Sequence, residues 1–157
     1  MQFVETTPTL AVPLRFVVGL GAGIVATLVM DLVMPRLPEG ATPPSIASGV
    51  LTTKSPSAAP ERLATVVHYI AGFLTGPLFV WLLFATEGVL GERSLAAVAT
   101  AGVVLYVLMV GFFAVVVLPR SMVAANRVGT IRRDWAIDAL AYVLVLVPLV
   151  TAGSAFL

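Results

Sequence analysis

The sequence has no cysteine, only one histidine, and few charged residues, which make up 11% of the chain. The absence of cysteine excludes disulfides, thiolate metal ligands and a cysteine nucleophile. A soluble domain has about 25% charged residues, so this chain lacks the polar surface of a soluble fold. Its nine Lys and Arg residues are scattered and its formal net charge is +1, which argues against nucleic acid as a partner.

Catalytic sequence motifs are also missing. There is no G-x-S-x-G, no H-E-x-x-H, no P-loop and no G-x-G-x-x-G. The glycine-rich stretch at 19–23 lies inside an apolar run, where a phosphate has no access. We therefore expect a protein that is not an enzyme. A membrane enzyme is the third alternative, because no nucleophile–base pair is visible.

Hydrophobic residues take the place of the missing charges, at 59% of the chain. Long apolar segments of about 20 residues are typical of membrane-spanning helices, in which every backbone group bonds within its own segment. A β-barrel is disfavoured because no alternating pattern occurs. We predict an all-α fold, a single four-helix transmembrane domain over residues 1–157. The expected helices are 13–34, 63–86, 95–118 and 135–157.

Positive residues indicate the orientation of the bundle. Seven Lys and Arg residues lie in the loops at 35–62 and 119–134, against two on the other side, Arg15 and Arg93. Cytoplasmic loops carry the excess of positive charge. We therefore predict that both loops are cytoplasmic and that both termini lie on the non-cytoplasmic side of the cell membrane.

Both predicted cytoplasmic loops leave two interpretations open. Six prolines in 35–62 forbid a long helix, but a short one could start at Pro44, with Ile46, Val50 and Leu51 on one side. That loop is either a polar connector or a lid that binds a partner or substrate. The 119–134 loop either attracts anionic lipid headgroups or serves only as a topology signal.

Small residues recur at helical spacing in the first two predicted helices. Residues four apart share a helix face, and small side chains let membrane helices approach closely. We expect these stripes to pack on each other within the chain, with a dimer interface as the alternative. The packing positions are Gly19, Gly23 and Thr27 in one stripe, and Gly72 and Gly76 in the other.

Three ionisable residues lie inside the predicted helices, namely Asp31, His68 and Asp138. At 1.5 Å per residue, all three lie about 6–9 Å inside the cytoplasmic boundary. Asp31 and His68 end the two small stripes, which predicts a contact between them. Intramembrane ionisable residues are functional hypotheses by default. This polar intramembrane cluster is either structural or binds a proton, an ion or a ligand.

A metal site is not expected, because one histidine and two carboxylates are a thin ligand set. Haem is a minor alternative, with His68 and either Met30 or Met34 as axial ligands. Methionine in an apolar helix is far more often a packing residue. We therefore predict no cofactor.

The residues of Gly23–Met30, followed by a proline-rich loop and then His68–Gly72, resemble a family of small prokaryotic four-helix membrane proteins of unknown function. The resemblance covers residues 19–80. The family carries Thr where this chain has Asp31. The resemblance implies a four-helix bundle and no established activity.

Taken together, the sequence predicts a non-enzymatic integral membrane protein, either an accessory subunit of a larger membrane complex or a small self-associating bundle. The alternative is a small transporter or a proton- or ion-conducting element that uses Asp31, His68 and Asp138. The lipid bilayer is the expected environment in both cases.

Overall fold

Long helices make up most of the structure, a computed structural model that describes residues 8–92 and 94–157. Within this part of the chain every regular element is helical, and four helices are long and apolar enough to cross a membrane. The predicted all-α fold, with four helices of membrane-spanning length and composition, is therefore confirmed. These candidate spanning helices are α1 (Pro8–Val33), α3 (Glu61–Leu90), α4 (Leu95–Phe112) and α5 (Ala125–Ser154).

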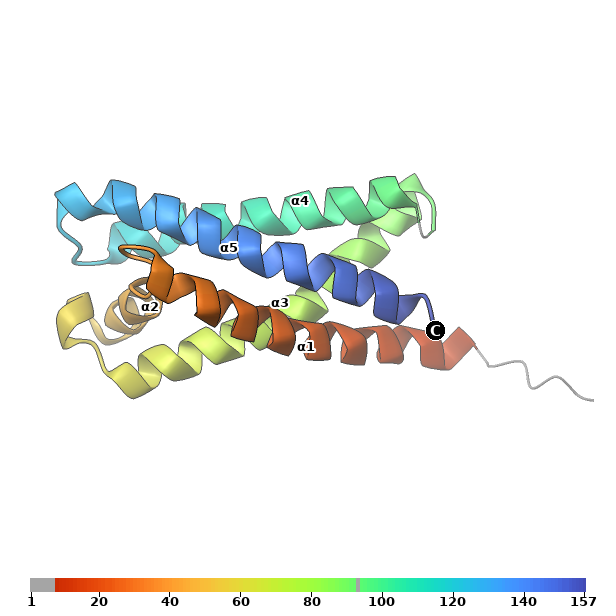
Figure 1. Ribbon diagram of the computed structural model, residues 1–157, viewed down its shortest axis with the longest axis horizontal. Coiled ribbons are helices and arrows are strands. Elements are labelled where there is room, and N and C mark those ends of the chain that lie inside the picture. The colour runs from red at the N-terminus through yellow and green to blue at the C-terminus, as the bar shows by residue number, and fades with distance from the viewer. Residues whose placement is uncertain (1–7, 93) are drawn as a thin grey trace, which may run out of the picture.

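The long helices lie lengthwise in one bundle, and the short helix α2 (Pro43–Thr52) covers one end of it (Figure 1). Helix α1 packs against both α3 and α5, and α4 packs against α3 and α5. Helix α3 runs diagonally, from α4 at one end of the bundle to α2 at the other. The start of α1 and the C-terminus lie together at the end opposite α2.

The last helix is longer than the sequence predicts. Helix α5 begins at Ala125, so the prediction of a loop over 119–134 is wrong for residues 125–134. Charged side chains lower the hydropathy there, but two of the arginines form ion pairs, one across the fold and one with the next residue of the helix. Arg127 pairs with Glu39, and Arg133 pairs with Asp134. Helix formation does not require a continuous apolar segment, because a surface helix carries its charged residues on its outer face.

The other helix ends also differ from the prediction. Helix α3 continues to Leu90 rather than stopping at 86, and Glu87 in this added turn pairs with Arg15. Helix α4 ends at Phe112 and continues as a π-helical turn, η3 (Phe113–Val117). A short 3₁₀ turn, η4 (Leu118–Arg120), ends that span.

Helix α2 shows that the 35–62 connection is packed against the bundle. It begins at Pro43, one residue before the predicted start. Ile46 is fully buried beside Phe113 and Leu118. Leu51, expected on the same side, is 65% exposed, so that part of the prediction is wrong. The buried residues of α2 are Pro43, Ile46, Ser48 and Gly49.

Glycines bring α1 and α3 into backbone contact. A Cβ added at Gly23 would lie 2.9 Å from the carbonyl oxygen of Phe73, and one at Gly76 would collide with the carbonyl oxygen of Gly19. A Cβ at Gly72 would collide with the side chain of Thr27, which is itself fully buried. The predicted stripes therefore pack on each other within the chain, through the positions Gly19, Gly23, Thr27, Gly72 and Gly76.

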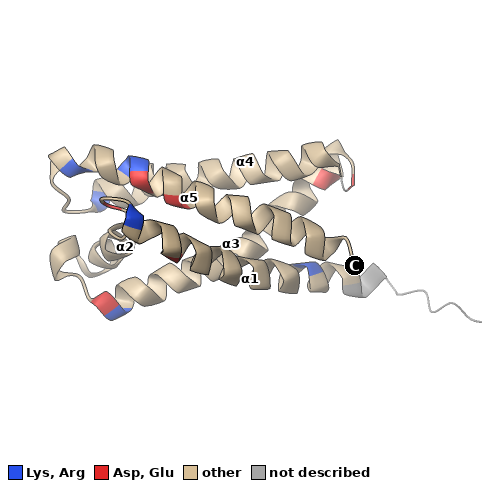
Figure 2. Cartoon of the chain, in the orientation of Figure 1, with Lys and Arg blue, Asp and Glu red and all other residues tan. Residues whose placement is uncertain are grey.

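Large apolar side chains cover the outside of the bundle as well as its inside. Val17, Leu32 and Leu144 are each more than 60% exposed, and the charged residues gather toward the two ends (Figure 2). An exposed apolar belt between charged ends is what a bilayer solvates.

The close approach of α1 and α3 predicts different responses from two glycines of α3. Gly76→Ala should lower the stability by about 1–3 kcal/mol, because its Cβ meets backbone that cannot yield. Gly88→Ala is the matched control, since nothing lies within 4 Å of its Cβ, and it should be neutral or slightly stabilising. Thermal unfolding in mild detergent measures both. Equal melting temperatures would contradict the packing.

Candidate functional site

The carboxylate of Asp31 holds two side chains of α3. His68 Nε2 lies 2.6 Å from Asp31 Oδ1, and the Tyr69 hydroxyl donates to Asp31 Oδ2 over 2.8 Å. A carboxylate only accepts hydrogen bonds, so Nε2 of His68 carries the hydrogen that it donates. The predicted contact between Asp31 and His68 is therefore present, and Tyr69 adds a second donor.

The small-residue stripes explain how these side chains meet. Asp31 lies in the last turns of α1, one turn beyond Thr27. His68 lies one turn before Gly72 on α3. Thr27 donates its hydroxyl hydrogen to Gly23 O over 2.7 Å, so this buried hydroxyl needs no partner on α3 where the two helices are in close contact. The pair is only partly buried, with exposures of 27% for Asp31 and 13% for His68.

Asp138 lies apart from this pair. Its side chain is completely buried, and neither carboxylate oxygen has a hydrogen-bond partner among the described residues. It is on α5, one turn after Asp134, which is also fully buried. Asp134 differs because it accepts hydrogen bonds from the backbone of Glu39 and from Arg133. The structure thus joins Asp31 and His68 but does not bring Asp138 into hydrogen-bond contact with them.

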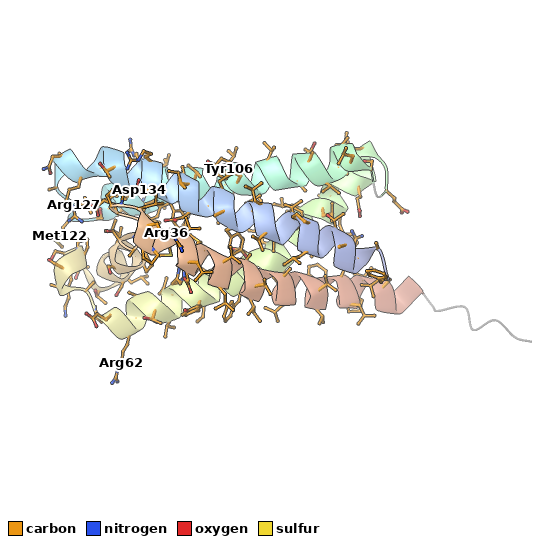
Figure 3. The ribbon with its side chains drawn as sticks, viewed as in Figure 1. Arg36, Arg62, Tyr106, Met122, Arg127 and Asp134 are labelled. Carbon is orange, nitrogen blue, oxygen red and sulfur yellow. The ribbon has the colours of Figure 1, made fainter. Side chains whose placement is uncertain are left out.

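A hydrogen-bonded group of Glu39, Thr42 and Arg127 connects the α1–α2 segment to the start of α5, where Figure 3 labels Arg127. Arg127 donates to both carboxylate oxygens of Glu39 at 2.7 Å, and Thr42 donates to Glu39 over 2.6 Å. The hydrogen bond from Arg127, and then that from Thr42, holds the pKa of Glu39 below its ordinary value of 4.5. The sequence does not predict this group, because Glu39 and Arg127 lie 88 residues apart.

A second ion pair lies at the opposite end of the bundle. Arg15 on α1 donates to both carboxylate oxygens of Glu87 on α3, over 2.8 and 3.0 Å. Its guanidinium also lies 4.4 Å from the ring centroid of Phe84. The sequence signal for this pair is a positive charge at the start of one apolar segment and a negative charge at the end of the next, which lie on the same side of the bundle. From the sequence, Arg15 contributes only to the predicted orientation. Arg93, which is counted with it, lies outside the described residues.

A cavity of about 240 Å³ opens between α3 and the α4–η3 segment, next to His68. Tyr142 and Trp135 of α5 form its inner wall, and Pro43 and Pro44 of α2 cover one end. The remaining lining is mostly apolar and comprises Met30, Ala47, Val67, Ala71, Gly72, Thr75, Met109, Phe112, Phe113 and Val117. Sequence reasoning did not find this cavity, because only the diagonal course of α3 creates it.

The residues suggested for metal or haem are arranged as follows. Among the described residues no three His, Cys, Asp or Glu side chains are close enough to hold a metal ion together. His68 and Met30 both line the cavity, whereas Met34 does not. Nε2 of His68 already binds Asp31, so a haem iron would have to displace that contact or use Nδ1. Haem ligation stays an untested prediction.

The contact of Asp31 with His68 predicts an energetic coupling. In a double-mutant cycle with Asp31→Asn and His68→Gln, the coupling should reach at least the average of about 0.6 kcal/mol for intramembrane polar pairs. Thermal unfolding in detergent measures the four proteins. The control cycle combines Asp31→Asn with Thr65→Val, an exposed residue on the preceding turn of α3. The coupling in this cycle should be near zero. The same coupling free energy in both cycles would show that the contact of Asp31 with His68 does not stabilise the fold.

Known proteins add nothing to this geometry. Comparisons of the chain with protein-family models, with curated proteins and with solved structures found no match. The site is therefore interpreted from its own residues, as a fixed polar clamp between α1 and α3 beside an apolar cavity.

Proposed function

We propose that this chain is a non-enzymatic multi-pass protein of the cell membrane that acts as an accessory subunit or as a small self-associating bundle. The observation that carries this proposal is the outer surface, where large apolar side chains cover every spanning helix. Such faces fit other membrane helices as well as they fit lipid. Few polar groups of the described spans remain for chemistry, because most already have partners inside the chain.

In this proposal the Asp31–His68–Tyr69 cluster is structural. Two donors satisfy the two oxygens of one carboxylate at the place where the α1–α3 interface ends. An intramembrane carboxylate without partners is costly, so the cluster favours one register of α1 against α3. A bundle with a fixed register presents a fixed outer face to its partner.

The orientation belongs to the same proposal, with the α2 end in the cytoplasm. Arg36, Arg62 and Arg127 lie at that end (Figure 3), and Arg132 and Arg133 follow Arg127 within the first three turns of α5. At the other end the charge of Arg15 is cancelled by Glu87. The cluster of Asp31 and His68 then lies on the cytoplasmic side.

The orientation can be measured with single cysteines, because the chain has none of its own. Cysteine at Ser57, beside α3, should resist an impermeant thiol reagent in intact cells. Cysteine at Glu92, between α3 and α4, should react. Both positions are exposed, so permeabilised cells provide the control in which both label. If the cysteine at position 57 reacts in intact cells and the one at position 92 does not, the bundle has the inverse orientation.

A second function, proton or ion conduction, is supported by one observation. Asp138 is completely buried with two unpartnered oxygens, which is the arrangement of a residue that binds a proton or a cation. Asp31 and His68 would extend the path toward the surface. The absence of a hydrogen bond between Asp138 and that pair makes this the weaker alternative.

Native mass spectrometry of the gently extracted protein separates the two functions. An accessory subunit should appear with a larger partner, and a self-associating bundle as a homo-oligomer. Conduction instead requires that the purified protein carry protons or ions across vesicles, with flux lost in Asp138→Asn and retained in Thr151→Val, an exposed position on the same helix. A monomer without flux would contradict both proposals.

A further inference from the structure

The cavity beside His68 has a chemical character of its own. Its wall carries four side chains with hydrogen-bonding hydrogens, namely His68, Thr75, Trp135 and Tyr142, and no side chain of Arg, Lys, Asp or Glu. A molecule with a formal charge would find no opposite charge in this wall, and a buried charge without a partner is costly. The occupant must therefore be neutral and largely apolar.

The hydrogens on this wall are already used within the protein. Tyr142 donates to Gly72 O over 2.5 Å, and Trp135 donates to Met109 O over 3.1 Å. Thr75 donates to Ala71 O over 2.7 Å, and His68 donates through Nε2 to Asp31.

Because these hydrogens are already engaged, the polar side chains of the cavity wall can only accept hydrogen bonds from a ligand. The hydroxyl oxygens of Thr75 and Tyr142 each keep a lone pair, because a hydroxyl has two acceptor sites besides its hydrogen. Trp135 has no acceptor to offer. A ligand that fits must bring a donor, so a hydroxyl group satisfies the wall where a ketone, ester or ether does not.

The location of the cavity determines where such a ligand comes from. The lining comes mostly from the spanning segments α3, α4 and α5, with Met30 of α1, and α2 lies over one end. Phe112 at its edge is 61% exposed, and Ala71 is exposed as well. Exposed apolar residues flank both positions, Ile70 and Leu74 beside Ala71, and Leu108 and Val115 beside Phe112. The entrance therefore lies in the lipid phase.

The π-helical turn contributes to the shape of this cavity. Phe113 and Val117, the two ends of η3, both line it. A π-turn inserts an extra residue into the helix and is frequently found at functional sites. Phe113 also packs against Trp135, with ring centroids 4.9 Å apart, so the turn holds the inner wall in place.

We propose that this cavity binds a neutral, lipid-soluble molecule that carries a hydroxyl group. The hydroxyl donates to Thr75 or Tyr142, and the apolar body lies between Val67 and Phe113. The rest of the ligand extends into the bilayer. In this proposal the hydrogen bond from His68 to Asp31, which Tyr69 also binds, fixes the imidazole of His68 at the edge of the site. This proposal holds for any oligomeric state of the bundle.

The test uses the fluorescence of Trp135 in the full chain, reconstituted in phosphatidylcholine vesicles. Trp81 is replaced by Phe so that Trp135, in the cavity wall, is the only tryptophan. The probe is 4-bromobenzyl alcohol, whose bromine quenches a nearby indole, and its methyl ether is the matched compound without a donor. Quenching is compared at equal concentration of each probe in the bilayer.

We expect saturable quenching by the alcohol, and binding of the ether about fivefold weaker because one hydrogen bond is lost. Ala71→Phe should abolish saturable quenching, since its ring fills the cavity. Ala85→Phe, at an exposed position of the same helix outside the cavity, should leave the quenching unchanged. Thermal unfolding of both variants verifies that they fold.

Two results would overturn the proposal. Quenching that rises linearly with either probe, and equally in the protein that keeps only Trp81, would mean partition into lipid without a site. Saturable binding with no preference for the alcohol would mean that the wall does not act as an acceptor. If Ala71→Phe does not fold, the comparison of alcohol with ether in the parent protein decides alone.

Discussion

The close approach of α1 and α3 is the constraint on which the rest of the structure depends. Backbone carbonyls of one helix lie where a Cβ of the other would stand, at Gly23 and Gly76 above all. In lipid no hydrophobic effect drives helices together, so contact area and polar bonds have to do so. Only side chains as small as these allow that contact, and Asp31 then reaches His68 within hydrogen-bond distance.

Polar groups are satisfied at three levels of the bundle. Glu39 and Arg127 join the α1–α2 connection to α5, and two further pairs join α1 to α3, Asp31 with His68 and, at the far end, Arg15 with Glu87. Asp138 departs from this rule, since its buried oxygens have no partner in the described chain. A group that breaks a rule obeyed elsewhere in the fold is the natural place to look for ion or proton binding.

The cavity follows from the same geometry. Helix α3 follows α1 along the glycine stripe and so leaves α4 as it approaches α2 (Figure 1). The wedge that opens between α3 and α4 is only partly filled, by Trp135 and Tyr142 from α5 and by the π-turn. Close packing on one side of a helix thus produces open space on its other side. The fold thus places a close helix interface next to the cavity.

The sequence by itself determined the number of helices long and apolar enough to span a membrane, the small-residue interface and the contact of Asp31 with His68, because these depend on local hydropathy and on spacing within one helix. It misplaced the start of α5, because hydropathy detects apolar segments and not the charged first turns of a helix, where Arg127 binds the distant Glu39. Tyr69, the isolation of Asp138 and the cavity were decided only by tertiary structure. They depend on crossing angles and on which face of α5 turns inward, and helical periodicity does not encode either.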